Sequence, residues 1–240
     1  MDIFNYESSS IKWCESAYSI SIYVCEILNT ASSLSYIYFS MLFFKNLGLY
    51  NNKFYLSNSN NKIYFYTIGY ITLLIGLFST YFHCTLSLSG QLLDEYSILA
   101  LICLFDLNYT KIILAKILIL IFLFVKFPIY NRLLLFSYGF YNFRSIALNY
   151  FNNKNSKQQK LFQFGVIIFF LSIFSWITDY FFCNNLYLSL HWLWHILSSY
   201  SLYIFSNYLF INFENLNFDY HYFKIITKKN IQNEFFNNQI

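Results

Sequence analysis

Charge is what this sequence has least of: 11% of its 240 residues are Asp, Glu, Lys or Arg, whereas 58% are hydrophobic. A soluble domain of this length would need more charged side chains to cover its surface. The net charge of +4 is small and no stretch is densely basic, so we expect no nucleic-acid partner. The composition indicates a protein that resides in a membrane.

Two sequence patterns are also missing. The short alternating segments that build a transmembrane β-barrel are absent. The opening residues are mixed polar, without the charged start and apolar core of a cleavable signal peptide. We therefore expect helices to cross the membrane, and the first of them to act as the insertion signal.

Long apolar runs do recur, and they approach or exceed the ~18–20 residues that cross a bilayer. They predict an all-α polytopic membrane protein with seven transmembrane helices, near residues 20–44, 63–84, 90–107, 111–128, 131–150, 161–182 and 188–211. We expect one transmembrane domain over residues 20–212, after an N-terminal segment at 1–19 and before a polar tail at 213–240.

The placement of lysines predicts the orientation of these helices. Lysines gather in the first, third and fifth connections and in the tail, whereas the opposite side has Lys12, Lys126 and Arg132. Loops rich in Lys and Arg stay in the cytosol. This rule places the C-terminal tail in the cytosol and the N-terminus in a lumen or outside the cell, and seven crossings agree with that placement.

Three of the predicted helices carry polar residues at membrane depth, where a charge costs at least ~2.5–3.5 kcal/mol on insertion scales. His83 ends the second helix and Asp94 begins the third. His191 and His195 begin the seventh. Because the second helix runs outward and the other two run inward, the topology alone brings these residues to a similar depth on the lumenal side.

The spacing of His191 and His195 places both imidazoles on one face of a helix. Two such histidines can ligate one zinc ion, and a third protein ligand leaves one position open for water, as in catalytic zinc sites. His83 is the only other histidine in the predicted helices, because His221 lies in the polar tail. The alternative is that the pair lies at the membrane interface and binds backbone or lipid headgroups.

The five cysteines include no CxxC pair of the kind that binds zinc. Cys14 and Cys183 both fall on the lumenal side of the predicted topology, where an oxidising compartment allows a disulfide. We expect Cys25 and Cys103 to pack as small hydrophobic side chains.

Three blocks of the sequence resemble one known family: KWCESAYSISIYVCEILNTASSL, LFSTYFHCTLSLSGQLLDEYSIL and SWITDYFFCNNLYLSLHWLWH. In order and spacing they resemble the alkaline ceramidase family, over roughly residues 8–212. That family belongs to a superfamily of seven-helix membrane hydrolases that includes adiponectin-receptor-like proteins. The resemblance implies a disulfide between Cys14 and Cys183.

The resemblance also implies a zinc-dependent reaction. The family's three zinc-binding histidines match His83, His191 and His195. Its catalytic aspartate matches Asp94, and a serine one turn before the first histidine matches Ser79. Zinc would lower the pKa of bound water. Asp94 would move protons between that water and the leaving amine, and Ser79 would donate a hydrogen bond to the developing oxyanion.

The acidic and hydroxyl residues also have plainer interpretations. Asp94 could cap a helix at the membrane interface, and Glu95 beside it could cap a helix or support the site. Ser79 could bond to the carbonyl four residues before it. Asp179 could accept a hydrogen bond from a metal-bound histidine, or it could cap the end of the sixth helix.

The N-terminal block departs from the family in one respect. Relatives hold a calcium ion near the zinc with a D-W-C-E-x-N motif and a later glutamate; here Trp13, Glu15 and Glu26 match, whereas Lys12 and Ala17 replace two ligands. Calcium takes 6–8 oxygen ligands, so the substitutions weigh against it. One hypothesis is that the Lys12 ammonium takes the place of calcium; the alternative is weak calcium binding through the two glutamates and backbone carbonyls.

The sequence therefore predicts an intramembrane zinc amidohydrolase of the endoplasmic reticulum or Golgi that cleaves ceramide to a sphingoid base and a fatty acid. Three alternatives stay open: a related hydrolase of another lipid amide or ester, a ceramide-binding receptor with little turnover, and a pseudoenzyme with structural zinc. The intact Asp94 argues against the last of these. The expected partners are ceramide and the bilayer, and no clear GxxxG stripe indicates a helix dimer.

Overall fold

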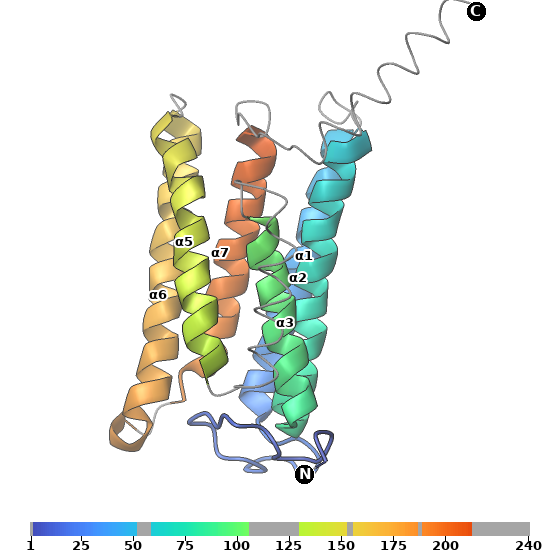
Figure 1. Ribbon diagram of the computed structural model, residues 1–240, viewed down its shortest axis with the longest axis vertical. Coiled ribbons are helices and arrows are strands. Elements are labelled where there is room, and N and C mark those ends of the chain that lie inside the picture. Colours follow the sequence, from blue (N-terminus) through green and yellow to red (C-terminus); the bar gives the residue numbers. More distant parts are fainter. Residues whose placement is uncertain (1, 52–58, 106–129, 153–155, 187–188, 213–240) are drawn as a thin grey trace, which may run out of the picture.

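The computed structural model describes residues 2–51, 59–105, 130–152, 156–186 and 189–212. The regular secondary structure within these ranges is helical, with no strand. The helices are α1 (Ile27–Asn51), α2 (Ser59–Thr85), α3 (Leu88–Leu104), α5 (Asn131–Asn152), α6 (Ser156–Leu186) and α7 (His191–Asn212). They run roughly along one common axis, as Figure 1 shows.

Five of the predicted helices agree with α2, α3, α5, α6 and α7 to within a few residues at each end. The predicted helix at 111–128 lies outside the residues that the structure describes. The first helix is the one whose start was wrong, because it was expected at residue 20 and α1 begins at Ile27.

The helix α1 begins later than expected because the residues before it form hydrogen bonds with the end of α2. The backbone N–H of Cys25 donates to the carbonyl of Cys84 at 3.0 Å, and that of Glu26 donates to the carbonyl of His83 at 3.1 Å. The last carbonyls of a helix have no partner within the helix. The residues just before α1 therefore stay outside the helix, because their N–H groups satisfy the end of α2.

Three of the described helices contain segments long and apolar enough to cross a membrane: Ile27–Gly48, Ile63–Thr85 and Gln158–Cys183. Large apolar side chains on the outside of the third remain exposed, such as Phe174 and Phe181 at 66% each. A soluble protein rarely leaves such extended apolar surface in water. The chain is therefore an all-helical membrane protein.

Glycine allows α1 and α2 to pack closely. A Cβ atom added at Gly76 would lie 2.6 Å from Cγ1 and 3.0 Å from the backbone N of Ile37. One added at Gly69 would lie 2.4 Å from the ring of Phe44. Beside this contact, the carbonyl of Gly69 accepts a hydrogen bond from Ser40 at 2.8 Å. The close approach of α1 and α2 fixes how the residues of one helix lie against those of the other. The contacts between these helices in the candidate site depend on this alignment.

The N-terminal segment covers one end of the bundle, where α2 ends and α3, α5 and α7 begin (Figure 1). Backbone hydrogen bonds attach it there, from Ser9 to the carbonyl of Leu86 and from Ser89 to the carbonyl of Ile3, both at 2.9 Å. A disulfide between Cys14 and Cys183 links it to α6. The segment thus closes the end of the bundle that carries the polar residues.

Candidate metal centre and adjoining cavity

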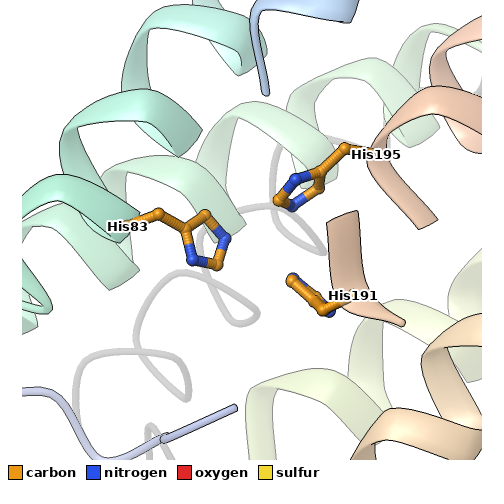
Figure 2. A group of neighbouring side chains, drawn as sticks. All are labelled: His83, His191 and His195. Atoms are coloured by element: carbon orange, nitrogen blue, oxygen red, sulfur yellow. The ribbon is translucent and has the colours of Figure 1, made fainter. Parts of the chain in front are cut away.

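Three histidines meet at this closed end of the bundle. His83 lies in the last turn of α2, His191 is the first residue of α7, and His195 follows one turn later. Each offers a ring nitrogen, and these three atoms lie within 4.8 Å of one another. All three side chains are buried, with 1–3% of their surface exposed. Figure 2 shows the rings converging from the two helices.

The hydrogen bonding of the imidazole rings leaves ring nitrogens available to a metal ion. Nε2 of His83 and Nδ1 of His191 are buried and have no hydrogen-bond partner among the described residues. A buried polar atom without a partner costs free energy, so an atom of this kind is suited to bind a ligand or metal ion. Three imidazoles suit a divalent transition metal, and three protein ligands with one open position are typical of catalytic zinc.

Two of the histidines are oriented by side chains of the α1 region. Nδ1 of His83 lies 2.6 Å from a carboxylate oxygen of Glu26. Nδ1 of His195 lies 2.8 Å from the hydroxyl of Ser32 and 3.3 Å from that of Ser33. Such outer partners fix the tautomer and the ring orientation of metal-binding histidines. They leave Nε2 of both rings available to a metal.

Aromatic packing orients the third histidine. The indole of Trp13 stacks on the ring of His191, with 3.6 Å between ring centroids and an angle of 18° between planes. Trp176 packs edge-on against the same indole at 5.9 Å. The N-terminal segment therefore forms one wall of the metal centre.

Asp179 accepts a hydrogen bond from His191, as one of the two sequence interpretations held, and it does not cap the end of α6. One carboxylate oxygen accepts the backbone N–H groups of Leu190 at 2.6 Å and His191 at 3.1 Å, and the other accepts that of Cys14 at 3.0 Å. The bond is to the backbone of His191 and not to its ring. Because the chain reverses after α6, Asp179 caps the start of α7 and anchors the N-terminal segment.

A cavity of about 240 Å³ adjoins the histidines. Its walls include Ser79, Asp94, His191 and His195, and the remainder of the lining is largely apolar and aromatic, as at Phe136. The sequence-predicted catalytic residues therefore lie beside the metal centre, in the same cavity.

The polar atoms of the cavity differ in their bonding. Oδ1 of Asp94 is buried and has no hydrogen-bond partner among the residues described. The hydroxyl of Ser79 lies 3.0 Å from that of Ser33, which also donates to the carbonyl of Asn29 at 2.8 Å. Both predicted catalytic side chains thus keep hydrogen-bonding capacity for a molecule in the cavity.

The acidic pair Asp94 and Glu95 lies beyond the first turn of α3 and does not cap this helix. Ser87 does so, because its hydroxyl accepts the N–H of Gly90. Glu95 instead accepts hydrogen bonds from the side chain of Gln91 at 3.0 Å and from that of Asn131. It thereby ties α3 to the start of α5, a role that spacing in the sequence did not indicate.

The position of Lys12 contradicts the hypothesis that its ammonium takes the place of calcium. Its ammonium lies 3.7 Å from the carboxylate of Glu7, with 71% of the side chain exposed, and not beside the buried glutamates. Glu15 accepts the backbone N–H groups of Leu28 at 2.6 Å and Asn29 at 2.8 Å. The substitution by Lys12 therefore brings no cation to the metal centre.

Burial raises the pKa of the Glu15 carboxyl above its usual 4.5. The two backbone hydrogen bonds from α1 lower it, and the nearby carboxyl of Glu26 raises it further. The proximity of these two acids resembles a cation site, but Lys12 and Ala17 supply no side-chain oxygen in place of the missing ligands. The motif does not fit a calcium ion, which needs 6–8 oxygens.

Comparison with known proteins gives one consistent result. A family model described as Ceramidase matches residues 5–228. Alkaline ceramidase 1 of Homo sapiens is 29% identical over 218 residues, covering 82% of this chain and 80% of that protein. Alkaline ceramidase 1 of Mus musculus is 32% identical, covering 82% and 77%. The alkaline ceramidase of Drosophila melanogaster is 28% identical, covering 79% and 72%.

Proposed function

The chain belongs to the ceramidase family, and from this premise we propose that it hydrolyses the amide bond of ceramide, releasing a sphingoid base and a fatty acid. We assign zinc to His83, His191 and His195. The observation that carries this proposal is the position of three buried imidazoles beside a largely apolar cavity. Two of them have a ring nitrogen without a partner in the described part of the chain.

The residues around the cavity supply the remaining chemistry. Zinc, when bound, lowers the pKa of water and polarises a carbonyl oxygen. Oδ1 of Asp94, to which no described residue bonds, takes the proton of the attacking water and returns it to the leaving amine. Ser79 lies one turn before His83 on the same face of α2, and its hydroxyl donates to the amide oxygen as negative charge develops there.

The lining of the cavity suits a lipid substrate. Apart from the polar residues at the metal centre it is mostly apolar, with aromatic rings from several helices, such as Phe105, Phe136, Phe169 and Phe205. Hydrocarbon chains bind such walls because apolar surface leaves water on both sides. The amide of ceramide then lies at the polar end of the cavity, between Asp94 and the histidines.

We further propose seven membrane crossings within residues 20–212, with segment 1–19 in the lumen of the endoplasmic reticulum or Golgi and tail 213–240 in the cytosol. Two observations support this orientation. Lysines predominate on the side opposite the metal centre. The disulfide between Cys14 and Cys183 lies at the metal-centre end, and disulfides persist in oxidising compartments.

The proposal is tested with the purified full-length chain in detergent. It is given a panel of ceramides together with other lipid amides and esters, and the released sphingoid base or fatty acid is quantified. We expect release from ceramide, and a loss of about 10²–10⁴-fold in Asp94→Asn, which removes the proton-transfer group. Preferential cleavage of another lipid, or ceramide binding without turnover, would contradict the proposal and favour a related hydrolase or a receptor.

A further inference from the structure

We propose that Glu15 is a positioning residue, and that its contact with α1 takes the place of a calcium ion in this chain. Glu15 binds the first backbone N–H groups of α1. This contact fixes the position of Glu26, which in turn orients the ring of His83. The inference rests on the proposed function in that His83 is taken to bind the metal. It concerns the support of that site and not the reaction itself.

The first link of this support is the bond between Glu15 and α1. Both of its carboxylate oxygens are used, one by the N–H of Leu28 at 2.6 Å and the other by that of Asn29 at 2.8 Å. The side chain is buried, with 8% of its surface exposed. The first N–H groups of a helix have no partner within it, and the helix dipole makes this end positive. The end of α1 therefore provides the positive potential that a cation would supply.

The second link runs from α1 to the metal centre. The side-chain amide of Asn29, whose backbone Glu15 holds, donates to Glu26 at 2.9 Å. The same oxygen of Glu26 lies 2.6 Å from Nδ1 of His83. Asn29, Glu26 and His83 are all at most 1% exposed, so water does not compete for these bonds. A displacement of Glu15 is thus transmitted to the ring of His83.

This arrangement offers calcium fewer side-chain oxygens than the family motif does. The oxygens of Glu15 already accept two N–H groups, and Glu26 is shared between Asn29 and His83. Lys12, where the family has an aspartate, turns outward to Glu7. The metal centre of this chain therefore forms without calcium, unlike the site implied by the family motif.

Matched variants test the positioning role. Glu15→Gln keeps the size of the side chain but replaces one carboxylate oxygen by an NH₂ group. One of the two backbone N–H groups of α1 then loses its acceptor and faces a donor. Glu7→Gln makes the same change at an exposed glutamate of the same segment. We expect about 10–100-fold weaker zinc binding in Glu15→Gln, an altered visible spectrum of its cobalt-substituted form, and partial recovery of both in Glu15→Asp. Glu7→Gln should match the unmodified chain. Equal zinc affinity and spectra in Glu15→Gln and Glu7→Gln would overturn the proposal.

Calcium titration provides the second test, which stands even if Glu15→Gln does not fold. The unmodified chain, freed of calcium and loaded with one equivalent of zinc, should bind no calcium and show no shift of its unfolding midpoint at millimolar calcium. The double variant Lys12→Asp with Ala17→Asn restores the family ligands and should bind one calcium per chain with a higher midpoint. One tightly bound calcium in the unmodified chain would overturn the proposal. Neither test uses ceramide, so a failure of the proposed function is recognised separately.

Discussion

In the histidines and Asp94, some polar atoms already have a hydrogen-bond partner within the protein and others do not. The ring nitrogen of His83 that faces away from the metal centre is held by Glu26, and that of His195 by Ser32. Nε2 of His83, Nδ1 of His191 and Oδ1 of Asp94 are buried and have no such partner among the described residues. This division between held and free atoms is the arrangement expected where a protein positions groups for a metal and a substrate.

Ser79 provides a prediction at this scale. Replacement by Ala removes the hydroxyl that we place against the developing oxyanion, while the neighbouring Ser33 keeps its bond to the carbonyl of Asn29. Loss of one oxyanion donor costs about 10²–10³-fold in kcat. Steady-state kinetics on ceramide should therefore show a fall of kcat in Ser79→Ala with little change in zinc content. An unchanged kcat would assign Ser79 to packing alone.

At the scale of elements, the site depends on how α1 packs against its neighbours. The region of α1 reaches the metal centre twice, through Glu26 to α2 and through Ser32 to α7. The contact through Glu26 requires α1 and α2 to lie close together, which Gly76 permits because a side chain there would meet the backbone of Ile37. The packing of these helices and the geometry of the metal centre are therefore coupled.

This coupling predicts the effect of enlarging the contact. Gly76→Ala forces atoms against backbone that cannot turn away, and overpacking of this kind costs roughly 1–3 kcal/mol. Gly48→Ala is the matched control, because nothing lies within 4 Å of the added Cβ atom. The unfolding midpoint in detergent should fall in Gly76→Ala and stay equal or rise slightly in Gly48→Ala. Equal midpoints in both variants would show that the helices are not held by this contact.

At the scale of the whole molecule, the N-terminal segment joins the parts of the site. It carries Trp13 against His191 and Glu15 against the start of α1, and Cys14 between them is joined to Cys183. Loss of the bridge would release the segment from the end of the bundle. The bridge therefore stabilises both the fold and the metal centre.

Cys183→Ser tests that role. Removing a native disulfide commonly costs about 2–5 kcal/mol, so we expect a lower unfolding midpoint and faster loss of zinc to a chelator. Cys84→Ser serves as the control, because Cys84 is a free cysteine at the same end of the bundle. If Cys183→Ser retained zinc as well as Cys84→Ser does, the segment would not be held chiefly by the bridge.

The convergence of the three histidines followed from the sequence, since the direction of each predicted helix fixes which ends meet. The partners of those histidines did not follow. Ser32 reaches His195 only through the register between α1 and α7, which no local spacing encodes. The role of Glu15 was hidden because the first helix was expected to begin at residue 20, which misplaced the N–H groups that Glu15 accepts. The charge of Lys12 suggested a buried cation, but a lysine keeps its ammonium in water where it can.

Removing zinc and restoring it tests most directly whether the three histidines hold a catalytic metal. The purified chain should contain one zinc per molecule, lose ceramide turnover when a chelator removes the metal, and recover turnover when zinc is restored. His191→Ala, which removes one of the three converging imidazoles, should hold less zinc and should not recover. Full turnover in a chain shown to be free of metal would contradict the assignment of zinc to this site.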